Sequence, residues 1–199
     1  KMELTNRQKQ AMTTKRKLLY TAYELIREQG YPALTIRRLC EKSGVSTGAF
    51  YHHYSSKEDL IAQGFASYDV VLTEFLESYE EPDPVKAIRH IVLSLNQYIY
   101  DNGAQFAKEL YISQLSIKDS YITRKDRSYY LAVLNYVEQA MDQGLFHSTM
   151  NAGGITDFLL RVGRGTILDW CLHDYAYDLM EQSARDLDFL LDNLTAGRG

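Results

Sequence analysis

The chain has 199 residues, of which 45% are hydrophobic, so it is long enough to form one or two globular domains. Its 12 glycines and 3 prolines are too few for a disordered or low-complexity chain. No apolar run approaches about 18 residues, so no membrane-spanning helix is indicated, and no secretory signal is visible. Cys40 and Cys171 lie far apart in helical segments, so we expect buried free thiols in a reducing, cytoplasmic compartment.

The net charge of −4 is divided unequally along the chain. Residues 1–60 carry 11 Lys and Arg against 6 Asp and Glu, whereas residues 61–199 carry 11 against 20. A basic amino-terminal part on an acidic remainder is typical of a protein that docks one end on DNA. The acidic part would be repelled by phosphates, which would help to orient the protein.

The first predicted element is an amphipathic helix over residues 13–29, because its apolar side chains recur every three or four positions. Gly30-Tyr31-Pro32 ends this helix. Two short helices joined by a glycine turn follow. Thr35 can cap the first, Gly44 ends it in a left-handed conformation, and Ser46 can cap the second. This pattern is typical of a helix-turn-helix, whose second helix enters the DNA major groove.

The second short helix would offer small, hydroxyl, aromatic and imidazole groups to its surroundings. Phe50 and Ala49 are the expected inward residues. The residues expected to face outward are Thr47, Gly48, Tyr51 and His52. Gly48 is a poor helix former that costs about 1 kcal/mol relative to alanine. Its missing side chain would let the backbone touch base edges or phosphates.

Ser56-Lys57-Glu58-Asp59 has the form of a capping box and opens the next helix, which we expect to run on to about Tyr79. A helix of this length should connect the DNA-binding part to the rest of the chain. Lys57 lies in its first turn, where positive charge is mildly unfavourable, and a bound phosphate would remove that penalty.

The remaining chain is also predicted to be helical, so the fold class is all-α, with no segment that alternates with period two. Asp83 and Pro84 start the first of these helices, and Gly144 ends the third. The expected ranges are about 84–100, 104–114, 121–143, 152–174 and 176–195.

The spaced pattern Gly44-Val45-Ser46-x-Gly48-x-Phe50-Tyr51-x-His53-Tyr54-x-Ser56-Lys57-x-x-Leu60 closely resembles the DNA-binding domain of the TetR family of transcriptional regulators. Leu34-Thr35-Ile36-x-x-Leu39-Cys40 also fits, although the family more often has alanine at the place of Cys40. The resemblance covers about residues 13–62. It implies a three-helix DNA-binding head over residues 1–60 and a six-helix ligand-binding and dimerisation body over residues 61–199.

The resemblance also implies which positions contact DNA. Tyr51 and Lys57 would mostly contact phosphates, whereas Thr47 and Gly48 would read bases. Arg37 would read bases or contact a phosphate. His52 lies beside the readers on the same helix, and both histidines could instead be solvated surface groups. The full candidate set is Thr35, Arg37, Ser46, Thr47, Gly48, Tyr51, His52, His53 and Lys57.

Two expectations concern the body. The resemblance implies a homodimer through the last two helices, the alternative being that these helices form a purely intramolecular core. The 16 tyrosines of the chain suit a pocket for an apolar or aromatic small molecule, although tyrosine also packs well in ordinary cores. The candidate pocket residues are Tyr98, Phe106, Tyr111, Tyr130 and Trp170.

These features together predict a ligand-responsive regulator, a repressor that a small molecule releases from a palindromic double-stranded DNA operator. The alternative is a constitutive DNA-binding protein without an effector, against which the large body argues. An enzyme is not expected, because no H-E-x-x-H, P-loop or paired C-x-x-C occurs. We therefore expect no catalytic residue, cofactor, metal site or membrane partner.

Overall fold

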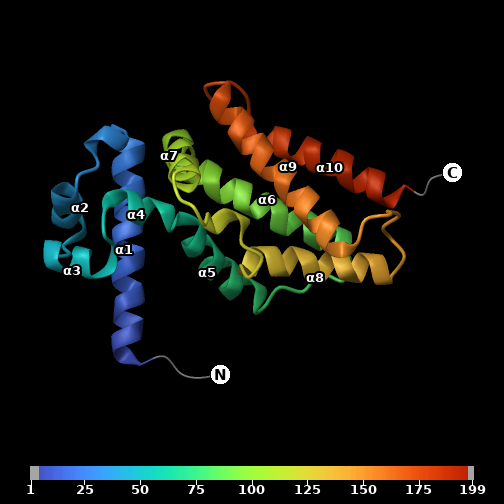
Figure 1. The fold of residues 1–199 in the computed structure, drawn as a ribbon, viewed down its shortest axis with the longest axis horizontal. Coiled ribbons are helices and arrows are strands. Elements are labelled where there is room, and N and C mark those ends of the chain that lie inside the picture. The colour runs from blue at the N-terminus through green and yellow to red at the C-terminus, as the bar shows by residue number, and fades with distance from the viewer. Residues whose placement is uncertain (1–4, 197–199) are drawn as a thin grey trace. The chain divides into compact units, whose positions relative to one another are not determined.

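The structure, a computed structural model, describes residues 5–196. This part of the chain is all-helical and contains no strand, which confirms the predicted fold class (Figure 1). It forms ten α-helices and two short 3-10 helices. Counting α4 and α5 as one interrupted helix gives the expected three helices of the head and six of the body.

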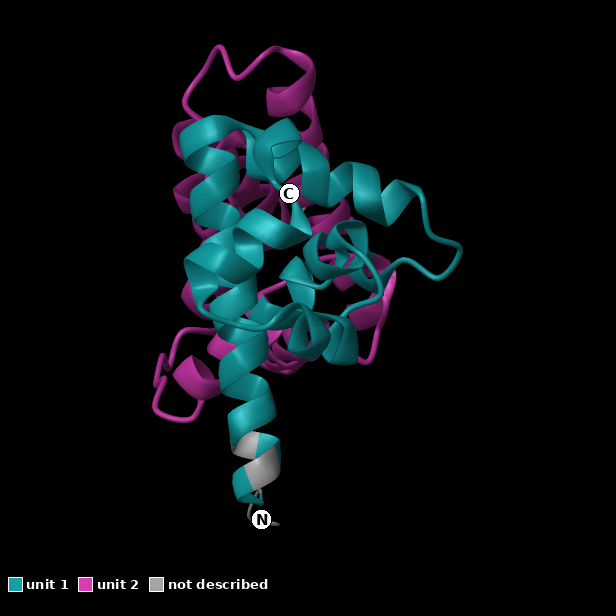
Figure 2. Ribbon diagram, turned by 90° about the vertical axis from the view of Figure 1, so that its left-hand side faces the viewer, with its two compact units in different colours: residues 1–67, 105–122 teal, residues 68–104, 123–199 magenta. Residues whose placement is uncertain are grey.

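The chain folds into two compact units (Figure 2). Unit 1 comprises residues 1–67 and 105–122, and unit 2 comprises residues 68–104 and 123–199. Residues 105–122 belong to the same compact unit as the amino-terminal segment. The boundary expected at residue 60 separates a DNA-binding part from a ligand-binding part, and it stays a prediction.

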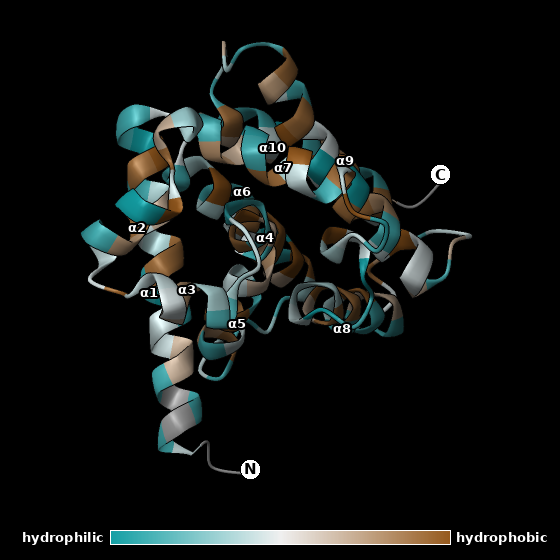
Figure 3. Ribbon diagram, turned by 60° about the vertical axis from the view of Figure 1, so that its left-hand side comes forward, coloured by the Kyte–Doolittle hydropathy of each residue, from teal (hydrophilic) through white to brown (hydrophobic). Residues whose placement is uncertain are grey.

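Unit 1 contains five helical elements from the amino-terminal segment and most of α7 (Ala104–Leu115). Those elements are α1 (Asn6–Gln29), η1 (Tyr31–Ala33), α2 (Ile36–Ser43), α3 (Thr47–His53) and α4 (Lys57–Ala62). Hydrophilic and hydrophobic residues are mixed along α1 (Figure 3). The core of the unit consists of fully buried apolar side chains, among them Leu18, Ile26, Leu34, Leu39, Phe50 and Leu60.

Hydroxyl caps start the short helices of unit 1, as the sequence predicts. The side-chain oxygens of Thr35, Ser46 and Ser56 accept from backbone N–H groups three residues later, at 3.3, 3.1 and 3.1 Å. Gly44 ends α2 with φ +63°, a left-handed conformation that glycine adopts without strain. The carboxylate of Asp59 accepts from the Ser55 N–H at 2.8 Å, one residue before the expected capping-box partner.

The predicted long helix from Ser56 is interrupted at Gln63, and its second part, α5 (Gly64–Leu76), ends before Tyr79. The Gln114 side chain donates to the Ala62 carbonyl at 2.9 Å, which satisfies the last residue of α4. Gly64 begins α5 in close contact with α1 and α7. A Cβ there would lie 2.9 Å from the Tyr23 Oη and 3.0 Å from a Leu110 methyl carbon. The interruption therefore follows from long-range packing within unit 1.

Unit 2 is a bundle in which α6 (Pro84–Asn102) packs against three helices (Figure 1). These are α8 (Ser128–Asp142), α9 (Ala152–Leu172) and α10 (Leu179–Thr195). Polar links join α6 to α10, because Asn96 donates to Ser183 at 2.8 Å and Arg89 forms a two-point pair with Asp188. The carboxylate of Asp83 caps α6, and Pro84 is its first residue, as predicted.

The helix expected over 121–143 begins only at Ser128, after the short η2 (Tyr121–Thr123). Arg127 immediately precedes it in an extended conformation and forms a buried ion pair with Asp69 of α5. Its Nε and Nη2 donate to the two carboxylate oxygens at 2.9 and 2.7 Å. The two side chains are 2% and 6% exposed, so the pair fixes where α8 starts.

The two cysteines differ in burial. Cys40 is buried as expected, whereas Cys171 is half-buried, because it lies near the end of α9. Neither forms a disulfide within the described part of the chain.

Replacing Arg127 with methionine should destabilise the protein by about 3–5 kcal/mol, because it leaves the Asp69 carboxylate buried without its cation. Urea unfolding followed by circular dichroism measures this loss. The matched control is Arg124→Met, which breaks an exposed pair with Asp126 and should cost less than about 1 kcal/mol. Equal effects of the two substitutions would contradict the structural role of the buried pair.

Candidate nucleic-acid interface and ligand cavity

The helix α3 is anchored from one side and open on the other. Phe50 is fully buried, and its ring lies 5.3 Å from that of Tyr51 and 5.8 Å from that of Tyr54. The residues predicted to face outward, Thr47, Gly48, Tyr51 and His52, are all exposed. Tyr51 is 56% exposed, which is high for a large aromatic side chain. The anchored helix therefore presents an exposed, mixed polar and aromatic face.

Gly48 lies on this face in open space. A Cβ added there would meet no atom within 4 Å, in contrast to Gly64, where it would collide with two side chains. Neither packing nor backbone conformation within the chain requires glycine at position 48. Glycine inside a helix costs about 1 kcal/mol relative to alanine. A molecule outside the chain that approaches the backbone closely would account for the residue.

Lys57 is held at the start of α4. Its ammonium donates to the Leu34 carbonyl at 3.1 Å and lies 4.4 Å from the centre of the Tyr31 ring. The Tyr31 hydroxyl in turn donates to Glu58 at 3.0 Å. Burial and the hydrogen bond to Glu58 raise the pKa of Tyr31, which keeps this phenol neutral. The ammonium has further N–H donors, so it can contact an anion from this fixed position.

The other predicted contact residues are also placed on the surface of unit 1. Arg37 is 88% exposed and pairs with Glu41 at 2.9 Å, one turn along α2. The hydroxyl oxygens of Thr35 and Ser46 accept cap hydrogen bonds, which leaves each hydroxyl proton able to donate. These side chains are thus compatible with contacts to phosphate oxygens.

His52 and His53 end α3 with their rings 5.1 Å apart in an edge-to-face arrangement. His52 is exposed, whereas His53 is half-buried. Burial lowers the pKa of His53 below its ordinary value, and His52 and Lys15 lower it further. His53 is therefore predominantly neutral at pH 7 in the free protein.

Sequence reasoning missed the supporting role of Tyr31. It treated Tyr31 only as part of a helix end, whereas the structure uses its ring and hydroxyl to position Lys57 and Glu58. The partners lie 26 and 27 positions apart, and no local pattern links them.

The segment Gly44-Val45-Ser46-Thr47-Gly48 also has the G-x-S-x-G spacing of a hydrolase nucleophile elbow. That elbow requires a strand before the serine, whereas here α2 precedes it. The hydroxyl oxygen of Ser46 caps α3. The segment is thus a helix-turn-helix turn and not a catalytic elbow.

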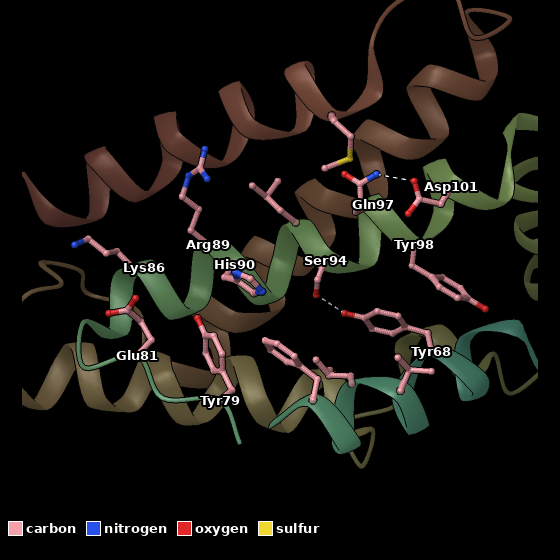
Figure 4. Close-up of a pocket in the computed structure, with 15 residues that line it drawn as sticks. Tyr68, Tyr79, Glu81, Lys86, Arg89, His90, Ser94, Gln97, Tyr98 and Asp101 are labelled. Carbon is pink, nitrogen blue, oxygen red and sulfur yellow. Dashed lines mark hydrogen bonds between the residues drawn. The ribbon is translucent and has the colours of Figure 1, made fainter. Parts of the chain in front are cut away.

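Unit 2 contains a cavity of about 680 Å³ between α5 and α6 (Figure 4). The Tyr68 hydroxyl and the Ser94 hydroxyl form a hydrogen bond of 2.6 Å that joins the two helices there. The apolar wall is formed by Val71, Leu72, Phe75, Leu93 and Met180. The polar and aromatic lining residues are Tyr68, Tyr79, Glu81, Lys86, Arg89, His90, Ser94, Gln97, Tyr98 and Asp101.

Of the five predicted pocket residues, Tyr98 lines this cavity. Phe106 and Tyr111 lie in the core of unit 1, where their rings contact Tyr23 and Phe65. The Trp170 indole donates to the Tyr177 carbonyl at 2.9 Å, and the Tyr130 ring lies 5.4 Å from the Lys125 ammonium. Neither is among the residues that line the cavity. The lining residues on α5 and α6 instead recur every three or four positions, a pattern visible in the sequence.

Residues 5–196 form neither a metal-binding cluster nor a membrane-spanning helix. No group of three or more His, Cys, Asp or Glu side chains there is arranged to hold a metal ion. None of the helices in this range is long and apolar enough to cross a bilayer.

The glycine turn, the capped short helices and the exposed face of α3 define a helix-turn-helix protein. Residues 18–63 match the family model described as "Bacterial regulatory proteins, tetR family". This match identifies a DNA-binding domain of the TetR family of transcriptional regulators in the amino-terminal part of the chain.

Two curated relatives align over most of the chain. The "HTH-type transcriptional regulator UidR" of Escherichia coli (strain K12) is 23% identical over 178 residues, covering 87% of this chain and 89% of that protein. The "Fatty acid metabolism regulator protein" of Bacillus subtilis (strain 168) is 21% identical over 187 residues, covering 89% and 93%.

A solved structure with the same fold is Thermus thermophilus FadR, described as a TetR family transcriptional repressor in complex with lauroyl-CoA. It has a TM-score of 0.62 and 18% identity, and the match covers 93% of this chain and 97% of that one. FadR from Bacillus subtilis in complex with stearoyl-CoA gives a TM-score of 0.59 at 16% identity, covering 89% and 98%.

The variant Gly48→Ala distinguishes an effect on folding stability from an effect on DNA binding. Because the added methyl group meets no atom, we expect the free energy of unfolding to rise by up to about 1 kcal/mol. Affinity for selected operator DNA should fall at least about tenfold, because the methyl group occupies the space of close approach. Urea unfolding and fluorescence anisotropy measure the two quantities. Unchanged DNA affinity in the stabilised variant would exclude close approach at this position.

Proposed function

We propose that the protein is a transcriptional repressor that binds a near-palindromic operator as a homodimer and is released by a small molecule. The observation that supports DNA binding is the exposed face of α3. This face includes Gly48, a glycine that packing within the chain does not require. The basic excess of residues 1–60 supports attraction to phosphates. Such a repressor works where the DNA is, in the cytoplasm.

The nine predicted residues form the proposed DNA contact set. They lie in α2, in α3, at the start of α4 and at the N-caps of α2 and α3, the elements that a helix-turn-helix brings to one groove. Tyr51 and Lys57 would contact phosphates, and Thr47 and Gly48 would lie against base edges. Arg37 would exchange its exposed partner Glu41 for DNA at small cost, because an exposed pair contributes little.

The cavity in unit 2 supports a ligand-responsive protein over a constitutive one. Its volume of about 680 Å³ lies within the range of small-molecule sites, about 300–1,000 Å³. The fatty-acyl-CoA complexes of the two FadR proteins show that this fold can hold a small molecule. A constitutive DNA-binding protein would need no such cavity.

The helix α5 provides a route from the cavity to α4. It begins at Gly64 in unit 1, and from Tyr68 onward it belongs to unit 2 and lines the cavity. A ligand that moves α5 would act on the Gln63 interruption and hence on α4, which begins with Lys57. A coupling free energy of about 1–3 kcal/mol would suffice to lower operator affinity usefully.

The proposed dimer interface lies on α9 and α10. Three large apolar side chains on these helices are exposed to solvent in the single chain: Phe158 at 37%, Leu172 at 81% and Phe189 at 68%. Gly165, on α9, has open space around its Cβ position, which permits close approach of another helix. A purely intramolecular role of α9 and α10 would leave this apolar surface in water.

Operator binding tests the first part of this proposal. Fragments of the native genome are selected by binding, and the affinity of a selected fragment is then measured by anisotropy. Tyr51→Ala should weaken binding at least about tenfold, because it removes a phosphate contact and the exposed aromatic face. Tyr20→Ala is the matched control, since Tyr20 is 52% exposed but lies on α1. Equal affinities of the two variants would contradict the site.

The oligomeric state tests the dimer interface. Phe189→Glu should raise the dimer dissociation constant at least about thirtyfold, because it places a charge in an apolar contact. Sedimentation velocity at micromolar concentration measures this change. Leu131→Glu is the control, because Leu131 is 50% exposed on α8, outside the proposed interface. A monomeric wild-type protein, or dissociation by the control alone, would refute the interface.

A further inference from the structure

The cavity between α5 and α6 is a long groove. Its lining positions on α6 run from Lys86 to Asp101 with a spacing of three or four residues, and those on α5 run from Tyr68 to Phe75 in the same way. At 1.5 Å per residue, the stretch of α6 is about 22 Å long. The groove therefore extends along about four turns of one helix face (Figure 4).

The volume of about 680 Å³ lies within the range of small-molecule sites, about 300–1,000 Å³, and it extends along about 22 Å of α6. The shape fits a single extended small molecule, and the lining of Val71, Leu72, Phe75 and Leu93 favours an apolar body.

The charges that line the groove are unequally compensated. Arg89 is neutralised by Asp188, at 2.6 Å, and Lys86 lies 3.8 Å from Asp83. Asp188 and Asp83 are themselves outside the lining. An anionic ligand would have to compete with these carboxylates for either cation.

The two lining carboxylates, Glu81 and Asp101, have no salt bridge with any residue in the described part of the chain. Glu81 accepts from the Asp83 N–H at 3.0 Å, and Asp101 accepts from the Gln97 amide at 2.7 Å. They lie at opposite ends of the stretch of α6 that the groove follows (Figure 4). When Asp83 and Asp188 are counted with Glu81 and Asp101, four carboxylates face Lys86 and Arg89, so the groove and its immediate partners carry a formal charge of −2.

Aromatic rings lie near both ends. Phe75, Tyr79 and His90 form a cluster with ring centroids 4.8–5.4 Å apart, close in sequence and space to Glu81. Tyr98 lies within one turn of Asp101, and its ring is 5.3 Å from that of Tyr68. Aromatic faces beside carboxylates attract organic cations, because the ring quadrupole and the carboxylate act in the same direction.

We infer that the groove binds an elongated lipophilic cation, whose apolar body lies along α5 and α6 and whose positive charge lies at Glu81 or Asp101. This inference rests on the proposed function only in taking the groove as the effector site. It differs from the anionic acyl-CoA ligands of the structurally similar FadR proteins. The difference follows from the absence of an uncompensated cation in the groove lining.

The test uses two probes with the same alkyl chain and opposite head charge, decyltrimethylammonium and decanoate, with lauroyl-CoA as a third. Isothermal titration calorimetry on the full chain measures each affinity. We expect decyltrimethylammonium to bind at least about tenfold more tightly than decanoate. Tighter binding of decanoate or lauroyl-CoA, or no binding of the ammonium probe, would overturn the inference.

Substitutions locate the charge. The double variant Glu81→Gln and Asp101→Asn should bind the ammonium probe about tenfold more weakly and lose the preference over decanoate. The matched control is Glu138→Gln with Asp142→Asn, which removes two exposed carboxylates of α8 outside the groove. Circular dichroism confirms that both variants are folded. A preference that survives in the groove variant, or disappears equally in the control, would contradict the assigned site.

Operator affinity separates the two proposals. If the ammonium probe binds in the groove without changing DNA affinity, the inferred ligand class is supported. The proposal that the groove is the effector site is then wrong. If lauroyl-CoA releases the operator and the ammonium probe does not, ligand-responsive repression stands and the lipophilic-cation inference is wrong.

Discussion

The buried ion pair between Asp69 and Arg127 is the constraint on which the arrangement of unit 2 depends. Taking two charges out of water is costly, and the cost is recovered only with good geometry, here two hydrogen bonds of 2.9 and 2.7 Å. The pair holds the middle of α5 against the start of α8, and Thr73 adds a hydrogen bond to Ser128 at 2.9 Å. Tyr68, the neighbour of Asp69, lines the groove. The ion pair of Asp69 with Arg127 therefore fixes the helix that forms this wall of the groove.

Two glycines show how differently the fold and the proposed function use the same residue type. Gly64 lets α5 begin against Tyr23 and Leu110, so packing within the chain explains it. Gly48 is surrounded by open space, and packing within the chain does not explain it. The first glycine therefore belongs to the architecture of unit 1. For the second we propose a role in close contact with operator DNA.

Local signals in the sequence were enough to predict the helix-turn-helix, because its caps involve residues three positions apart. Thr35, Gly44 and Ser46 take the conformations and hydrogen bonds that their residue types favour. The interruption at Gln63 and the late start of α8 were not predicted, because each depends on a partner far along the chain. Gln114 lies 52 positions from Ala62, and Asp69 lies 58 positions from Arg127.

The pocket residues were harder to predict, because aromatic composition does not distinguish residues that line a cavity from residues that pack in the hydrophobic core. Phe106 and Trp170 are buried by ordinary packing, whereas the groove uses one face of α5 and one of α6. The charge of this groove depends on which of its ionised side chains have no ion-pair partner. That property depends on partners such as Asp188, which lies 99 positions from Arg89.

The proposed placement of α3 on DNA is tested most directly by hydrogen–deuterium exchange with and without a selected operator fragment. Exchange of the backbone amides of Thr47–His53 should slow on DNA binding, together with that of the amides at the start of α4. The exchange rates of the α9 amides should be the same with and without DNA. Unchanged exchange in α3, with protection confined to other surfaces of the chain, would contradict recognition through this helix.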